Sequence, residues 1–129
     1  TSYTELRRDA LDVERWNMLH PDQPARTSYV ESCLKDAADV IVSASDYMKS
    51  MPDLIAKWAP GRLESLGTDG FGRSDTREAL RDFFEVDARF VTLATLHALA
   101  REGQVDSELV SEAIEDLAID PEKPNPRLS

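Results

Sequence analysis

The order of apolar and polar positions predicts a chain of helices interrupted by two short strands. Leu6, Ala10, Val13 and Trp16 recur at helical spacing, which predicts a helix over residues 3–19. Similar amphipathic stretches predict further helices over residues 29–35 and 47–58, the second with Ser45 and Asp46 as candidate caps. Asp75 and Glu78 predict a capping pair for a helix that continues through Phe84. Asp87 predicts the cap of a helix over residues 88–101, which Gly103 would end, and Asp106 predicts the cap of a last helix that reaches Leu117. Because a proline interrupts helical hydrogen bonding, Pro52 predicts a break, with the second half of the helix over residues 47–58 restarting at this proline.

Two apolar segments have the character of strands. Residues 39–44 contain Val40, Ile41 and Val42 in an unbroken run, which is typical of a parallel strand buried on both faces. Residues 62–66 predict a second, shorter strand. The pattern therefore predicts an α/β fold. A buried strand needs neighbours at both edges, so either short strands escape the pattern or part of the sheet lies outside this chain.

Composition narrows the class of protein further. The 129 residues are enough for one domain, predicted over residues 1–120, and the proline-rich residues 121–129 predict an extended or disordered tail. A net charge of −10 argues against nucleic-acid and anionic-membrane partners, which require a basic surface. The single cysteine, Cys33, cannot form an internal disulfide, which favours a reducing, cytoplasmic setting.

The segment from Leu66 to Phe84 holds three of the five glycines, and a phosphate-binding loop is one interpretation. Gly67, Gly70 and Gly72 match neither the spacing of a P-loop nor that of a dinucleotide-binding turn. The helix that follows could hold an anion at its N-terminus, but a turn or contact loop fits the pattern better.

The histidines and tryptophans offer weaker signals. His20 and His97 have no second histidine or cysteine at helical spacing, so neither predicts a zinc site. Trp16 and Trp58 could anchor a protein interface or pack in a core. The residues by themselves form no self-sufficient active site.

Three stretches together resemble one enzyme family: "TSYTELRRDALDVERWNMLHP" (residues 1–21), "SASDYMKSMPDLIAKW" (43–58) and "LGTDGFGRSDTREALRDFFEVDARFV" (66–91). They are similar to the C-terminal domain of the homodimeric, acetyl-transferring bacterial pyruvate dehydrogenases, which are thiamin-diphosphate enzymes of the transketolase type. The ending "IDPEKPNPRLS" (119–129) resembles the same family. The similarity extends over essentially the whole chain.

This resemblance implies a Rossmann-like, mainly parallel sheet flanked by helices and truncated at its N-terminal side. It implies an oxidoreductase that decarboxylates pyruvate and passes the acetyl unit to lipoyl groups of the dihydrolipoyl acetyltransferase component. Thiamin diphosphate and magnesium would be bound by other domains, so we expect no catalytic, cofactor-binding or metal-binding residue in this chain. The expected partners are a second subunit of a homodimer and the acetyltransferase component, with no nucleic acid or membrane.

The glycine-rich loop then resembles the turn that leads from a strand to a capped helix in such domains. We expect Asp69, Gly70, Phe71 and Gly72 to form this turn, with the glycines supplying positive φ and Phe71 plugging an apolar neighbour. Arg73 and Asp75 would pair with charges across a domain or subunit boundary, and Trp16 is a further candidate for an interface.

Two alternatives from other classes remain open. One is an independent anion-binding or small-molecule-binding module that uses the helix end at Ser74 and Asp75. The other is an autonomous enzyme built around His20 or His97.

Overall fold

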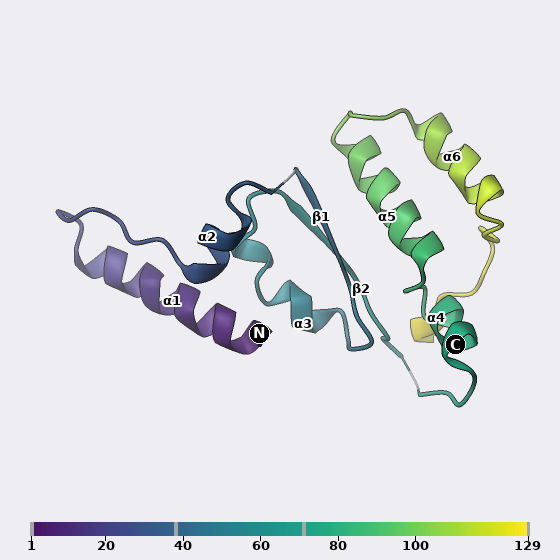
Figure 1. Ribbon diagram of the computed structural model, residues 1–129, viewed down its shortest axis with the longest axis horizontal. Coiled ribbons are helices and arrows are strands. Elements are labelled where there is room, and N and C mark those ends of the chain that lie inside the picture. Colours follow the sequence, from purple (N-terminus) through teal and green to yellow (C-terminus); the bar gives the residue numbers. More distant parts are fainter. Residues whose placement is uncertain (1, 38, 71, 129) are drawn as a thin grey trace. The chain divides into compact units, whose positions relative to one another are not determined.

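The computed structural model describes residues 2–37, 39–70 and 72–128 (Figure 1). Contacts divide the chain into two compact units, Thr1–Ile41 with Ser50–Leu63 and Val42–Lys49 with Glu64–Ser129. The elements, in chain order, are α1 (Tyr3–Leu19), α2 (Tyr29–Leu34), β1 (Val40–Ala44), α3 (Ser50–Asp53), the 3-10 helix η1 (Ala56–Trp58), β2 (Arg62–Leu66), α4 (Arg77–Phe83), α5 (Ala88–Arg101), α6 (Ser107–Asp116) and the 3-10 helix η2 (Pro126–Leu128).

The strands β1 and β2 pair with each other in a two-stranded sheet. At its start, the backbone N–H of Arg62 donates to the carbonyl oxygen of Asp39 at 2.8 Å, and at its end Ser45 donates to Leu66 at 3.1 Å. Because both strands advance in the same direction between these two bonds, the sheet is parallel. The predicted α/β class with parallel pairing is therefore confirmed.

The predicted burial of the first strand on both faces is wrong for the described residues. In β1, residues 40–43 are only half-buried and Ala44 is exposed. Two strands cover too little of each other to bury a continuous β-branched run. The apolar run correctly predicted the position of the strand, but the strand is less buried in this chain than the run predicts.

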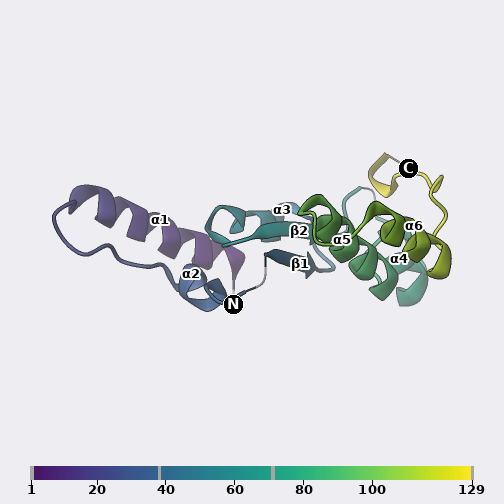
Figure 2. The ribbon, with the colours of Figure 1, turned by 90° about the horizontal axis from the view of Figure 1, so that it is seen from above.

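The first unit has its core between α1 and the elements that follow it. In this core Ala10 and Val30 contact Ile55 and Trp58, and all four side chains are at most 8% exposed. Helix α1 packs against both α2 and α3; α2 is seen beside α1 in Figure 2. Trp58 therefore belongs to the core, and its indole Nε1 also donates a hydrogen bond of 3.1 Å to Glu14.

The helix predicted over residues 47–58 is wrong in its first part. Helix α3 begins at Ser50, and η1 forms separately over Ala56–Trp58. Tyr47 cannot start a helix here because its carbonyl oxygen accepts a hydrogen bond of 2.9 Å from the backbone N–H of Thr68. Pro52 lies inside α3 and does not begin a new helix, and it is almost fully buried. A proline in a first helical turn removes no helical hydrogen bond.

The second unit contains the long helix α5, which packs against α6 (Figure 1). Its predicted N-cap is confirmed, because the side chain of Asp87 accepts a hydrogen bond of 3.1 Å from Phe90. Gly103 follows with a φ of 74°, as predicted for a glycine that ends a helix. Asp106 occupies the N-cap of α6, although its side chain makes no capping hydrogen bond. None of the helices that the structure describes is both long enough and apolar enough to cross a membrane.

Candidate functional site

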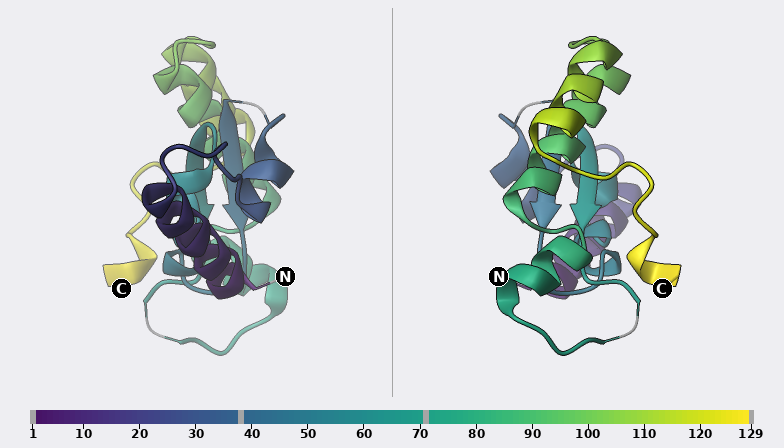
Figure 3. Two further views of the ribbon diagram at one scale, coloured as in Figure 1. Left: turned by 90° about the vertical axis from the view of Figure 1, so that its left-hand side faces the viewer. Right: turned by 90° about the vertical axis from the view of Figure 1, so that its right-hand side faces the viewer.

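The segment that joins β2 to α4 (Figure 3) is the one that the sequence singled out. Its residues belong to the second unit. Its first residues continue the pairing of the two chain segments beyond the sheet. The backbone N–H of Thr68 donates to Tyr47, and the Thr68 hydroxyl donates to the carbonyl oxygen of Asp46 at 2.8 Å. The start of the loop is therefore fixed by hydrogen bonds to the segment that follows β1.

Close backbone approach explains the first glycine. A Cβ on Gly67 would lie 2.8 Å from the backbone nitrogen of Lys49, and still nearer to the carbonyl oxygen of Tyr47. Asp69 adds a side-chain anchor, because its Oδ1 accepts a hydrogen bond of 3.0 Å from the N–H of Lys49. Asp69 is therefore a structural residue of the loop.

The two later glycines play different roles. Gly70 has a φ of 110°, and a Cβ there would lie 2.8 Å from the carbonyl oxygen of Pro126. The predicted need for positive φ is confirmed at Gly70. It is wrong at Gly72, which lacks a positive φ and has open space where a side chain would stand. Phe71 lies outside the described residues, so its predicted apolar contact stays a prediction.

Arg73 and Asp75 occupy the exit of the loop. The guanidinium carbon of Arg73 lies 4.0 Å from the ring centroid of Phe83, a cation–π arrangement. One oxygen of Asp75 accepts a hydrogen bond of 2.8 Å from the N–H of the next residue, Thr76. Both contacts are made within this chain, and the expected charge pairs across a domain or subunit boundary stay a prediction.

The N-cap of α4 is Thr76, so the predicted capping pair of Asp75 with Glu78 is wrong. The Thr76 hydroxyl accepts a hydrogen bond of 3.2 Å from Ala79, and Thr76 itself has the extended backbone of a cap. The sequence offered two adjacent capping residues, and only the backbone conformation decides between them. An acidic side chain and a hydroxyl thus already occupy amide donors at this helix end.

A cavity of about 470 Å³ lies between the loop and α4. Its apolar part comes from Leu80, Phe84 and Val86, of which Phe84 and Val86 are at most 9% exposed. Around it stand three arginines and two acids: Arg73, Arg77, Arg81, Asp46 and Asp75. We call this cavity the arginine groove.

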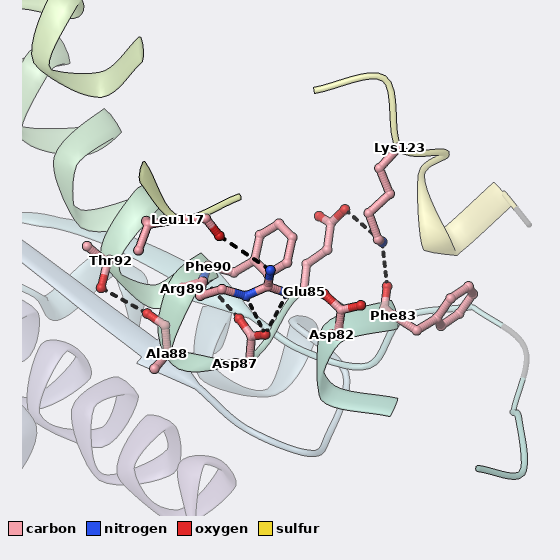
Figure 4. Close-up of polar contacts among 10 residues, drawn as sticks. All are labelled: Asp82, Phe83, Glu85, Asp87, Ala88, Arg89, Phe90, Thr92, Leu117 and Lys123. Atoms are coloured by element: carbon pink, nitrogen blue, oxygen red, sulfur yellow. Dashed lines mark hydrogen bonds and ion pairs between the residues drawn. The ribbon is translucent and has the colours of Figure 1, made fainter. Parts of the chain in front are cut away.

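The C-terminal tail is anchored beside α4 (Figure 4). The ammonium group of Lys123 donates to the carbonyl oxygen of Phe83 at 2.9 Å and lies 3.3 Å from a carboxylate oxygen of Glu85. The sequence predicts an extended or disordered tail, and the structure contains the short 3-10 helix η2 within it. No local pattern indicated the contact of Lys123, because its partners lie far away in the sequence.

Arg89 joins three parts of the second unit (Figure 4). Its guanidinium donates to Asp87 at 3.1 Å and to the carbonyl oxygen of Leu117 at 3.4 Å, and it also bonds to Asp82. The hydrogen bond with Asp87 is the main cause of a raised pKa of Arg89, which keeps this group charged. These contacts connect the first turn of α5 to the C-terminal end of α6.

Trp16 belongs to the first unit, unlike the candidate residues of the loop. Its half-buried ring stacks on His20, with centroids 4.2 Å apart, and the guanidinium of Arg26 lies 3.6 Å from the ring centroid. The structure thus gives Trp16 contacts within its own unit. His97 is exposed on α5.

Nowhere among the described residues do three histidine, cysteine, aspartate or glutamate side chains gather as metal ligands. We assign no step of thiamin chemistry to the described residues.

Comparison with known proteins decides the family. The model of the transketolase-like TK C-terminal domain matches residues 1–87. The chain belongs to this family. It is 52% identical to the pyruvate dehydrogenase E1 component of Pseudomonas aeruginosa over 126 residues, which are 97% of this chain and 14% of the relative.

Two further relatives carry the same name. The protein of Escherichia coli K12 is 48% identical over 130 residues, covering 100% of this chain and 14% of the relative. The protein of Mycolicibacterium smegmatis is 45% identical over 120 residues, covering 93% of this chain and 13% of the relative. The chain thus corresponds to about a seventh of the length of these relatives and is homologous to a segment of each.

Proposed function

We propose that this chain is the C-terminal domain of a cytoplasmic, thiamin-diphosphate-dependent pyruvate dehydrogenase. The full enzyme would decarboxylate pyruvate and transfer the acetyl unit to lipoyl groups of the acetyltransferase component. The observation that carries this proposal is the identity of about half of all positions to proteins named pyruvate dehydrogenase E1 component, over nearly the whole chain. In the full-length protein, a further strand beside β1 would give this half-buried strand the cover that its apolar run requires.

Within that enzyme we propose a structural role in organising the dimer. Two features of the loop support it. Its path is held by Asp69 and by the close approach of Gly70 to the tail, while Arg73 and Arg77 stay exposed. A loop that is anchored at Asp69 and presents exposed arginines suits a contact with another polypeptide surface.

The test uses the full-length protein with Gly70→Val, and with Gly72→Val as the matched control. A side chain at Gly70 conflicts with its positive φ and with Pro126, whereas at Gly72 it meets open space. We expect Gly70→Val to raise the dimer dissociation constant, measured by sedimentation. The single-turnover rate of pyruvate decarboxylation in the dimers that remain should be unchanged. Wild-type assembly combined with a lost chemical step would refute the proposed role.

A further inference from the structure

The arginine groove combines an apolar floor with a positive rim. Arg77 and Arg81 are one helical turn apart on α4, as are Leu80 and Phe84, so each pair shares a side of the helix. Arg73 joins the same rim from the loop. The groove can therefore hold an apolar side chain while guanidinium groups reach its polar neighbours.

The guanidinium groups of this rim make few polar contacts with acidic groups of their own chain. The Arg77 side chain is exposed, and the guanidinium of Arg81 approaches Asp46 only to 3.9 Å. Arg73 contacts the Phe83 ring, which leaves its N–H donors available. Three arginines against two acids make the rim positive in a chain whose net charge is −10.

These properties select the chemistry of an occupant. A guanidinium group binds a carboxylate through two parallel hydrogen bonds, and the apolar floor accommodates a large aliphatic side chain. The matching surface is therefore one in which carboxylates flank an exposed apolar residue.

The chain itself carries such a surface on α6. Leu109 is 43% exposed, and Glu108 and Glu112 are exposed beside it at helical spacing. Helix α6 contains four acidic residues and no basic one. Several other exposed apolar residues have basic neighbours: Leu11 lies between Arg7 and Arg15 on α1, Met48 precedes Lys49, and Leu128 follows Arg127.

We infer that the arginine groove binds the acidic face of α6, centred on Leu109, from a second copy of the chain. The inference rests on the proposed dimer-organising role and names the contact that would carry it. In a two-fold dimer the contact forms twice, because each copy presents both surfaces. Carboxylates of Glu108 and Glu112 pair with Arg77 and Arg81, and Leu109 enters the apolar floor.

The test is a charge exchange in the full-length protein, followed by sedimentation. We expect Arg77→Glu with Arg81→Glu to raise the dimer dissociation constant about tenfold or more, and Glu108→Arg with Glu112→Arg to do the same. Combining all four substitutions should restore most of the affinity. Arg7→Glu with Arg15→Glu is the control, since both are exposed and make no ion pair with the described residues.

A second measurement needs no substitution. Raising the salt concentration from about 0.05 M to about 0.5 M should weaken the wild-type dimer more than the dimer of either reversed variant. Unchanged dissociation constants in the reversed variants, or no recovery in the combined one, would overturn the inference. If Gly70→Val weakens the dimer while the charge reversals do not, the dimer-organising role stands and only the α6 contact is refuted.

Discussion

The ammonium group of Lys123 donates a hydrogen bond of 2.9 Å to the backbone carbonyl oxygen of Phe83, which lies 40 residues earlier. This contact joins the proline-rich tail to the C-terminal end of α4. A cation is well placed there, because the last carbonyl groups of a helix lack partners within the helix. The lysine therefore holds the tail against the same helix that forms the arginine groove.

We expect Lys123→Met to destabilise the protein by about 1.5–3 kcal/mol, the usual range for a hydrogen bond to a charged group. Methionine replaces lysine with an unbranched side chain of similar length, so the substitution removes mainly the bonds of the ammonium group to Phe83 and Glu85. Urea unfolding measures the change, and faster proteolysis after residue 120 would locate it in the tail. Lys35→Met is the control, because Lys35 is exposed. Equal stability of the two variants would contradict an anchoring role of Lys123.

Two glycines of the loop provide a second, matched prediction. A methyl group on Gly67 would collide with the backbone of Tyr47 and Lys49, so Gly67→Ala should cost about 1–3 kcal/mol, as overpacking does. Gly72→Ala meets no atom within 4 Å, and it should be neutral or stabilise by up to about 1 kcal/mol by restricting the unfolded chain. Thermal unfolding of both variants compares them directly. A destabilised Gly72→Ala variant would show that the loop is more tightly packed than the structure indicates.

The stability of the first unit should depend on the ionisation of Glu14. A hydrogen bond from Lys57 is the main cause of a lowered pKa of Glu14, with its Oε1 2.8 Å from the ammonium nitrogen. A carboxyl group whose pKa is lowered on folding stabilises the protein above its unfolded pKa. That stabilisation is lost as the pH falls through the folded value, which lies below 4.5.

The melting temperature of Glu14→Gln should therefore be lower than that of the wild type at neutral pH, and the difference should shrink below about pH 4.5. Glu78→Gln serves as the control, because Glu78 is exposed. A difference that is constant from acidic to neutral pH would mean that the ion pair with Lys57 does not form.

Elements with local signals were predicted well from the sequence. Helix α1 follows from its apolar spacing, and helix α5 follows from its apolar residues and its cap, Asp87. Strand β2 has the predicted bounds, Arg62–Leu66. In contrast, α3 was misplaced because Tyr47 bonds to Thr68, a residue beyond the next strand. The candidate loop was located correctly, yet the reasons for its glycines differ from one position to the next.

The sequence by itself determined the amphipathic helices, the two strand segments and, through its similarity to a family, the class of domain. Periodicity and capping act over a few residues, so they can be read without knowing the packing. Only the tertiary structure decided that Gly70 must accommodate Pro126, that Asp69 holds Lys49 and that Lys123 anchors the tail. These contacts join segments far apart in the chain, and their geometry exists only once the intervening elements have packed.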